Sequence, residues 1–351
     1  MDIKRKALFI YPALSSFIKK DIEILENQYQ LITYELRIIK KWHTPFLMLH
    51  QFFFLLFHFN ASVCIIEFAG FHSLIPTIFC KLFNIPTLII CGGNDCHSFP
   101  AIRYGNHHKF PLSFATQVSL NYCTHISTKD ESLWVSEYNY DSRFPGLQGI
   151  KAFIPKIKTP NTTIHNGYDI EFWKKTESTR KSLSFITVSG NLNLGFQKEL
   201  KGIDLIIEAA KQFPTFTFTI VGARTNHLLK DFPSNIHVLG NKNAAELRSL
   251  YSSHEYYLQL SIAEGFPNSL CEAMLCGCTP IVSNVFSMSK IVNDAGLIIQ
   301  KRELQQLIDV FNEIEKNHKL NEDISRDNIA ENYSIEKREV KLLKLVNDLS
   351  N

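Results

Sequence analysis

The stretch that decides the fold runs from residue 256 to residue 284 and reads YYLQLSIAEGFPNSLCEAMLCGCTPIVSN. Its first part, Tyr256–Ile262, is aromatic and apolar, which is typical of a parallel strand buried on both faces. A glycine and a proline then interrupt the strand, and a short helix is expected from Ser269 to Gly277. Thr279–Ser283 reads as the next strand. The order strand, loop, helix, strand predicts one unit of an open α/β sheet.

Two carboxylates flank the loop of this unit. Glu264 follows the strand, and Glu272 is expected in the first turn of the helix. Ligands of open α/β sheets bind beyond the carboxyl ends of the strands, and a helix N-terminus attracts phosphate. A carboxylate accepts hydrogen bonds from sugar hydroxyls, so the combination suits a nucleotide sugar. In the structural alternative, Ser269 and Glu272 form a capping box and Glu264 is an ordinary loop acid.

The residues around the two glutamates resemble the E-x7-E signature of retaining glycosyltransferase family four, whose members have the GT-B fold. The matching segments are Glu264 to Ser269, Glu272 to Met274, and Cys276-Gly277-x-Thr279-Pro280. The resemblance implies that Glu264 contacts the transferred sugar and Glu272 the ribose. It also implies that the loop amides face the diphosphate and the sugar. The donor-binding residues would then be Glu272, Lys198, Gly265, Phe266, Pro267, Asn268, Ser269 and Gly190.

Two lysines precede the helix that is expected to begin at Ile203. The segment Lys201-Gly202-Ile203-Asp204-Leu205 is similar to the K-G-x-D-x segment of the family, where an arginine and a lysine clamp the donor diphosphate. The resemblance therefore implies a catalytic role for Lys201 beside Glu264. Lys198 stands where arginine is common, and lysine offers a point charge instead of a bidentate fork. Alternatively, both lysines are merely solvated.

A second candidate segment, Gly92-Gly93-Asn94-Asp95, follows the expected strand Ile85–Cys91. Glycines at a strand end let the backbone come close to a ligand, although a plain strand-to-loop turn needs them too. The segment resembles the G-G-x-D sequence in the first domain of some bacterial family members. This implies that Asp95 or His97 faces the sugar or the acceptor, with Gly92 and Gly93 nearby, and makes Asp95 a candidate catalytic residue.

Composition limits the classes of function. The chain has 351 residues, is 45% hydrophobic and 20% charged, and is therefore globular. Its formal net charge of +3 argues against strong nonspecific binding of nucleic acid. The eight cysteines form no C-x-x-C pair and no zinc spacing with histidine, so we expect reduced thiols and no metal site. Because no Asp-x-Asp pair occurs, the lysines are expected to neutralise the diphosphate without a metal.

Strands alternate with helices along the chain, which predicts doubly wound, mainly parallel sheets. We expect a Rossmann-like acceptor-side domain at residues 1–168 and a linker at 169–182. A second Rossmann-like domain that binds the nucleotide sugar would span 183–325, across a cleft from the first. The resemblance implies that a C-terminal helix at 326–351 crosses back to the first domain. Asp130–Tyr138 also reads as a helix.

The most apolar segment is Pro45–Phe59, PFLMLHQFFFLLFHF. It is shorter than the roughly 18–20 residues that a spanning helix needs. It is either a buried or half-buried helix of the first domain, or a helix lying on a membrane surface, for which Lys40 and Trp42 would be suitable flanks. The apolar part of the N-terminus is too short for a signal peptide. We therefore expect a cytoplasmic protein, attached peripherally to the inner face of the cell membrane in the second case.

The resemblance thus implies a retaining glycosyltransferase of the hexosyltransferase class. It would move a sugar from a nucleotide-diphosphate sugar to a saccharide or lipid-linked saccharide, in the synthesis of capsule, O-antigen or exopolysaccharide. One alternative is a nucleotide-sugar epimerase of the same architecture. Another is a noncatalytic scaffold subunit of a polysaccharide assembly. Transfer needs an acceptor, epimerisation does not, and a scaffold turns over nothing.

Overall fold

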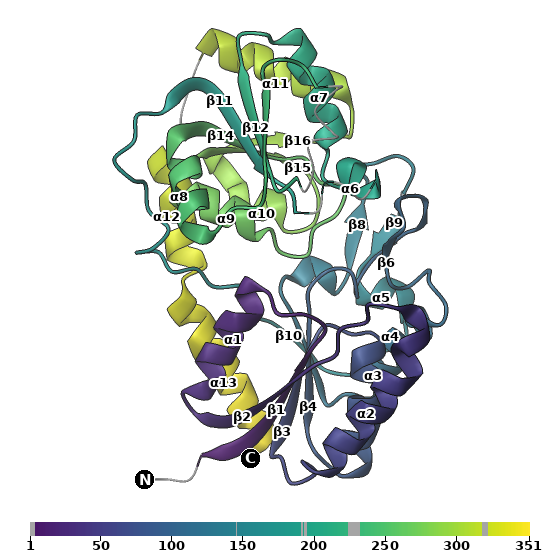
Figure 1. Cartoon of the computed structure of the whole chain (residues 1–351). Coiled ribbons are helices and arrows are strands. Elements are labelled where there is room, and N and C mark those ends of the chain that lie inside the picture. Colours follow the sequence, from purple (N-terminus) through teal and green to yellow (C-terminus); the bar gives the residue numbers. More distant parts are fainter. Residues whose placement is uncertain (1–3, 145, 191, 193–194, 224–231, 318–321) are drawn as a thin grey trace. The chain divides into compact units, whose positions relative to one another are not determined.

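The computed structural model describes residues 4–351 apart from 145, 191, 193–194, 224–231 and 318–321 (Figure 1). The chain forms two compact units, and neither is continuous in sequence. Unit 1 comprises Met1–Ser136, Leu147–Asn166 and Glu336–Asn351. Unit 2 comprises Glu137–Gly146 and Gly167–Ile335. Each unit is built around a six-stranded sheet.

The sheet of unit 1 has the strand order β10-β7-β4-β3-β1-β2, and all its strand pairs are parallel. β3 and β4 are buried along their whole length, as expected for parallel strands covered on both faces. The strands are β1 (Arg5–Tyr11), β2 (Tyr29–Glu35), β3 (Val63–Glu67), β4 (Thr87–Cys91), β7 (His125–Thr128) and β10 (Asn161–Thr163).

Helices cover both faces of this sheet, α1 and α13 on one side and α2, α3 and α4 on the other (Figure 1). α13 is held by Arg338, which donates to both carboxylate oxygens of Asp21 on α1 at 2.6 Å, with both side chains buried. The helices are α1 (Ser16–Glu26), α2 (Thr44–Leu56), α3 (Phe71–Leu82), α4 (Leu112–Tyr122), α5 (Ile150–Phe153) and α13 (Ile335–Ser350).

The sheet of unit 2 has the order β13-β12-β11-β14-β15-β16 and is also parallel throughout. The chain builds outward from β11 on one side and from β14 on the other, so the strand order reverses between these two strands. Open α/β sheets bind their ligands at such a reversal. The strands are β11 (Lys181–Val188), β12 (Thr217–Val221), β13 (Ile236–Leu239), β14 (His254–Gln259), β15 (Thr279–Ser283) and β16 (Leu297–Ile299).

Seven helices described in unit 2 flank this sheet: α6 (Gly195–Leu200), α7 (Ile203–Gln212), α8 (Ala244–Ser253), α9 (Asn268–Leu275), α10 (Met288–Val292), α11 (Leu304–Asn317) and α12 (Glu322–Asn332). Shorter elements of the chain are β5 (Ser98–Phe99), β6 (Tyr104–Gly105), β8 (Ser136–Tyr138), β9 (Gly146–Gln148) and the 3-10 turns Lys41–His43, Pro100–Ile102, Glu131–Leu133 and Asn293–Ala295. In the described part of the chain, no helix combines the length and the apolarity that a membrane span requires.

The predicted doubly wound parallel sheets are confirmed, but two predicted helices are wrong. The segment Asp130–Tyr138 contains only a 3-10 turn and then strand β8. A helix does not continue there because the main-chain carbonyl of Trp134 accepts a hydrogen bond from the amide of Lys151.

The expected C-terminal helix is interrupted between α12 and α13. The backbone at Tyr333 and Ser334 pairs with Tyr168 instead of continuing the helix: the amide of Tyr168 donates to the carbonyl of Tyr333, and the amide of Ile335 donates to the carbonyl of Tyr168. The break coincides with the boundary between the units, because α12 belongs to unit 2 and residues 336–351 belong to unit 1.

Candidate active site

The candidate site lies beyond the carboxyl ends of β11 and β14, where the strand order of unit 2 reverses. Ser189 and Gly190 follow β11. On one side this turn is closely packed, because Gly222 has a φ of +107° and a Cβ there would lie 2.5 Å from the carbonyl oxygen of Ser189. On the other side, a Cβ at Gly190 would meet no atom of the described residues within 4 Å. The turn therefore leaves room next to the end of β11.

Lys201 and Glu264 meet at this end of the sheet, with the Nζ of Lys201 2.5 Å from Oε1 of Glu264. Gly202 makes the approach possible: its φ is +67°, and a Cβ would lie 2.2 Å from the carbonyl oxygen of Leu260. The amide of Ile262 also donates to the carbonyl of Leu200 at 2.8 Å. The chain before α7 is thus tied to the chain after β14, which brings together two residues 63 positions apart.

Three donors converge on one oxygen of Glu264. Besides Lys201, the side-chain amide of Gln259 and the hydroxyl of Ser261 each donate to Oε1 at 2.7 Å. The Gln259 amide is itself oriented, because its Oε1 accepts from the Tyr257 hydroxyl at 2.8 Å. Burial raises the pKa of Tyr257, which keeps this hydroxyl protonated. The other oxygen of Glu264, Oε2, accepts no hydrogen bond from any residue that the structure describes, so it keeps its capacity to accept one from a ligand.

Side-chain contacts of Phe266 and Asn268 hold the loop after Glu264 in place. Phe266 is buried, and its ring packs edge-on against Tyr333 with 5.4 Å between the centroids. Asn268 accepts a hydrogen bond from the Tyr168 hydroxyl at 2.7 Å. Pro267 occupies the N-cap position of α9, and no side chain caps this helix end. Because the first N–H groups of a helix have no partner within it, the α9 N-terminus can donate to an anion.

The capping box considered for Ser269 and Glu272 is not formed. α9 begins one residue earlier than predicted, at Asn268, so Ser269 is its second residue and Glu272 lies in its second turn. The Ser269 hydroxyl instead lies 2.8 Å from the Tyr257 hydroxyl and 3.4 Å from Oε1 of Gln259. Glu272 is half-buried. The capping-box explanation of this pair of residues is therefore wrong, and the contact of Glu272 with a ribose stays a prediction.

Lys198 differs from the charged residues around it. Its neighbour Glu199 pairs with Arg143, and Asp204 pairs with Arg302. Lys198, on α6, is half-buried and forms no ion pair with any residue in the described ranges. This uncompensated cation suits the predicted contact with a diphosphate.

In unit 1, Asp95 is buried and its carboxylate is occupied by main-chain donors. Oδ1 accepts from the amides of Gly92 and Gly93 at 3.1 and 3.0 Å, and Oδ2 accepts from the amide of Ala69 at 3.0 Å. Gly92 also packs so closely on the ring of Phe68 that a Cβ would lie 2.3 Å from it. The segment joins the end of β4 to the end of β3. This geometry favours a structural role for Asp95, and the side chain of His97 is likewise fully buried.

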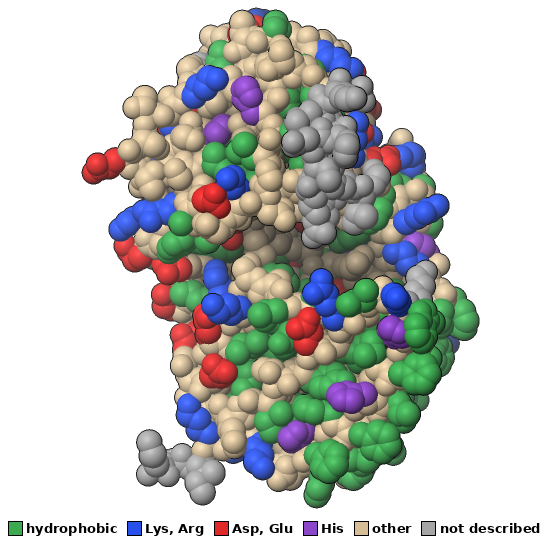
Figure 2. All heavy atoms as spheres, viewed as in Figure 1, with side chains coloured by type: hydrophobic (Ala, Val, Ile, Leu, Met, Phe, Trp, Pro, Cys, Tyr) green, Lys and Arg blue, Asp and Glu red, His purple; other side chains and the backbone are tan. Residues whose placement is uncertain are grey.

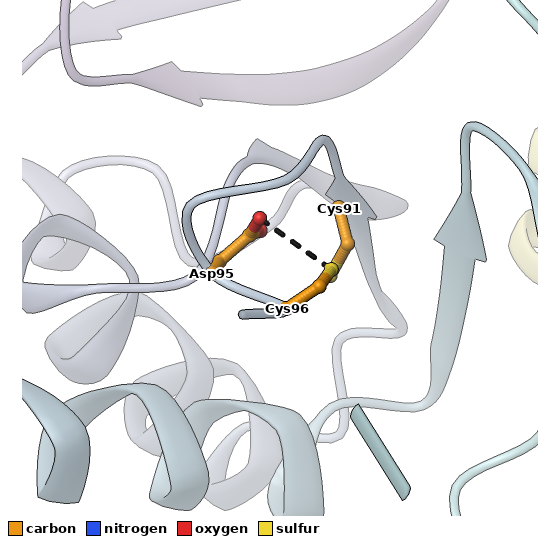
Figure 3. A group of neighbouring side chains, drawn as sticks. All are labelled: Cys91, Asp95 and Cys96. Carbon is orange, nitrogen blue, oxygen red and sulfur yellow. Dashed lines mark hydrogen bonds between the residues drawn. The ribbon is translucent and has the colours of Figure 1, made fainter. Parts of the chain in front are cut away.

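Two groups of side chains place potential metal ligands within 4.8 Å of one another: Cys91, Asp95 and Cys96 (Figure 3), and Asp130, Glu131 and His165. In the first group, burial raises the pKa of Cys91 and raises that of Cys96 to about 11, so both thiols stay protonated. Cys96 donates weakly to Asp95, with 3.6 Å between Sγ and Oδ1 (Figure 3). In the second group, Oδ1 of Asp130 accepts from the amide and the hydroxyl of Ser132. Neither group offers a prepared set of ligands.

Sequence reasoning missed the residues that orient Glu264. Gln259 and Ser261 are polar residues inside an otherwise apolar buried strand and its continuation, and this anomaly is the signal that would have identified them. A third contact stabilises the chain next to Glu264, and nothing in the sequence indicated it. The hydroxyl of Tyr138 donates to the carbonyl of Ile262 at 3.0 Å, and Tyr138 belongs to the segment 137–146 that is part of unit 2.

Known proteins resemble this chain in sequence and in fold. Residues 169–331 match the family model described as glycosyl transferases group 1. Over 178 residues the chain is 27% identical to the GtfA subunit of a UDP-N-acetylglucosamine–peptide N-acetylglucosaminyltransferase from Streptococcus pneumoniae serotype 4, covering 45% of this chain and 34% of that protein. The match thus spans about a third of the length of that relative.

Two solved structures resemble nearly the whole chain. Sucrose-phosphate synthase from Thermosynechococcus elongatus is similar with a TM-score of 0.74 at 11% identity, over 99% of both chains. HepE from Anabaena, solved with UDP and glucose, has a TM-score of 0.69 at 13% identity and covers 98% of this chain and 99% of its own. Likenesses at such low identity show the fold alone, and they confirm the predicted GT-B class.

Proposed function

We propose that the chain is a retaining glycosyltransferase whose donor is a nucleoside-diphosphate sugar, because residues 169–331 match the family model described as glycosyl transferases group 1. The acceptor in this proposal is a saccharide or a lipid-linked saccharide, and the product is a bacterial surface polysaccharide made in the cytoplasm. Uridine diphosphate is the first nucleotide to test, because UDP-N-acetylglucosamine appears in the name of the GtfA relative and UDP is bound in the HepE structure.

One observation carries the proposal: Lys201 and Glu264 meet at the reversal of the strand order, and one carboxylate oxygen is saturated while the other is available. A carboxylate held in this way accepts hydrogen bonds from sugar hydroxyls without having to reorient. Lysine carries three N–H donors, so Lys201 can bind Glu264 and still reach a phosphate oxygen. In one donor molecule, the sugar would therefore bind to Glu264 and the diphosphate to Lys201, its partner in the ion pair.

Three groups of the protein can stabilise the negative charge that develops on the diphosphate during transfer. In the proposed reaction an acceptor hydroxyl oxygen bonds to the anomeric carbon, the bond from that carbon to the phosphate oxygen breaks, and the acceptor proton passes to the leaving diphosphate. Negative charge grows on the diphosphate as its bond breaks. Lys198, Lys201 and the α9 N-terminus lie at this end of unit 2 to stabilise it. We propose that these groups make a bridging metal unnecessary.

The donor site is tested by thermal unfolding of the full chain with UDP, GDP, ADP and CMP and their sugars, with and without EDTA. A ligand that binds only the folded state raises the melting temperature by mass action. We expect one diphosphate to stabilise the wild type in EDTA and to fail with Lys201→Met. Lys211→Met is the matched control, because Lys211 pairs with Glu208 at 2.6 Å on the exposed surface of α7, away from the strand reversal. This control should respond to the nucleotide as the wild type does.

Turnover then separates the classes of function. With a saccharide acceptor the wild type should release the nucleoside diphosphate, and the new glycosidic bond should keep the anomeric configuration of the donor. Conversion of the donor sugar without any acceptor would replace the proposal with an epimerase. Absence of any stabilising nucleotide would favour a scaffold and remove the role assigned to Lys201. Stabilisation that disappears in EDTA would overturn the metal-independent part alone.

A further inference from the structure

Helix α2 of unit 1 has its polarity reversed relative to an ordinary surface helix. Its polar residue Gln51 is fully buried, and its side-chain amide donates to the main-chain carbonyl of His72 at 2.9 Å. Leu55 is the other buried residue of the helix. Phe46 and Phe53, by contrast, are 67% and 52% exposed. A helix that only packs on its own sheet normally buries the phenylalanines and exposes the glutamine.

The exposed apolar side chains form a continuous surface over α2 and α3. We define the α2–α3 apolar face by Trp42, Phe46, Phe53, Phe57, Leu82 and Phe83, each at least 48% exposed. The face is continuous across the helices because Phe59, after α2, lies 6.3 Å from Phe83 between ring centroids. Figure 2 shows hydrophobic side chains gathered in the lower right of the view, over the place of α2 in Figure 1. Apolar patches of this kind on a folded chain mark contact with another apolar surface.

The stretch of sequence that carries this face is poor in acidic residues. From Leu36 to Lys129 the sequence holds only two acidic residues, Glu67 and Asp95, and both are buried. Several basic residues in the same stretch are exposed: Arg37, Lys40, Lys81 and Arg103. Among the described side chains, no acidic one appears in the lower right corner of Figure 2. The stretch from Leu36 to Lys129 therefore combines exposed aromatic rings with exposed basic residues, and the exposed acid next to it in sequence is Glu35, at the end of β2.

We propose that the α2–α3 apolar face binds the surface of an anionic lipid bilayer. Rings of phenylalanine and leucine would enter the boundary between headgroups and acyl chains, and the lysines and arginines would contact lipid phosphates. Trp42 has the amphipathic ring that is enriched at this boundary. α2 has 13 residues and would lie in the plane of the interface. A second copy of the same face is a poorer occupant, because it would bring like charges together.

The proposal does not depend on the sugar donor, so its test uses binding alone. The full chain is floated with vesicles of phosphatidylcholine and with vesicles in which about one third is phosphatidylglycerol. We expect binding to the anionic vesicles, weaker binding at high salt and little to the zwitterionic ones. The double variant Phe53→Ser with Phe57→Ser should lower the vesicle affinity by about tenfold or more, since each ring contributes buried apolar area. Ile324→Ser, on α12, is the matched control because Ile324 is 53% exposed, as Phe53 is.

The folded state of each variant is checked by its melting temperature, which should not fall because the replaced rings are exposed. Wild-type protein that stays soluble beside both kinds of vesicle would overturn the proposal. So would a wild-type dimer that the double variant dissociates while vesicle binding is absent, because the face would then belong to a second copy. An equal loss of vesicle binding in the Ile324→Ser control would show that binding is not located on α2 and α3, which also overturns the proposal.

Discussion

The loops after β4 and after β14 hold their carboxylates in opposite ways. Both loops follow a buried parallel strand, and both place an acid a few residues beyond it. Asp95 receives main-chain amides on both of its oxygens and is 1% exposed, so its bonding capacity is used within the protein. From the residues that the structure describes, Glu264 receives only side-chain donors, all on Oε1. Asp95, with main-chain donors on both oxygens, stabilises the conformation of its loop. Glu264, with side-chain donors on one oxygen, keeps its second oxygen available to a ligand.

The largest effect is expected from Glu264→Gln. This change removes the charge opposite Lys201 while keeping the shape, and loss of one prepared electrostatic contact lowers catalysis by about 10² to 10³. The free energy of unfolding should change by less than about 1 kcal/mol, because the ion pair is partly exposed. Steady-state kinetics of transfer and urea unfolding of the same samples check both parts. Unchanged kcat/KM beside a large loss of stability would make Glu264 resemble Asp95 and end the comparison.

Asp95→Ala should show the reverse pattern. Three amides lose their acceptor, two of them buried and that of Gly92 partly buried, and each unsatisfied buried group costs about 1 kcal/mol or more, so we expect about 2 to 3 kcal/mol less stability. Asp95→Asn keeps one acceptor oxygen and should lose less. Chemical unfolding measures both variants, and activity is normalised to the folded fraction. If Asp95→Ala is fully stable yet inactive, this carboxylate contacts a substrate after all.

Glu67 is a third buried acid, and its neighbour is a lysine side chain instead of main-chain amides. It ends β3 and lies 3.4 Å from the Nζ of Lys129. Burial raises the pKa of Glu67 to about 8, whereas an unfolded glutamate titrates near about 4.3. Between these values the folded state holds a proton that the unfolded state releases, so stability is greatest below the unfolded pKa and falls as the pH rises towards 8.

Glu67→Gln removes this titration. Between about pH 5 and about pH 8 the wild type should lose unfolding free energy more steeply than the variant, by about 1 kcal/mol per pH unit. Urea unfolding over a pH series measures the two slopes. Parallel slopes would mean that Glu67 is already ionised beside Lys129 in the folded protein. Glu67 would then resemble Glu264, which pairs with a lysine, more than it resembles Asp95.

The smallest effect is expected from Ser261→Ala. It removes one of the three donors to Oε1 of Glu264, and one such hydrogen bond contributes about 1 kcal/mol, which corresponds to about a fivefold lower kcat. A positioning role predicts that KM for the donor changes less than kcat. Ser253→Ala is the control, since that hydroxyl bonds only locally at the end of α8, to Leu250 O and within 3.2 Å of His254 Nδ1. Equal effects of the two variants would show that Ser261 does not orient Glu264.

The sequence predicted those features that depend on local patterns of residues. The alternation of strands and helices predicted both parallel sheets, and the segments around Glu264 and Lys201 were predicted to act together before their contact was visible. The use of each carboxylate was not predictable, because it depends on which amides approach it. Asp95 is held partly by the amide of Ala69, and no local pattern announces a partner at that distance in sequence.

Boundaries were harder to predict for the same reason. Residues 137–146 join unit 2 through long-range contacts such as that of Tyr138 with Ile262. The break between α12 and α13 depends on pairing with Tyr168, which is far away in sequence. Helical spacing alone continues through Ser334, because the competing partner is not part of the local sequence.

The bond between Arg338 and Asp21 has a consequence for the order of biosynthesis. The two residues are 317 positions apart, and Asp21 is fully buried in the finished unit. While the chain is still on the ribosome, the first unit lacks the residue that neutralises this carboxylate and the helix that covers it. An unpaired buried charge is strongly destabilising, so unit 1 cannot complete its fold before Arg338 has been made. All of the residues of unit 2 precede Arg338, and unit 1 is therefore the later of the two units to mature.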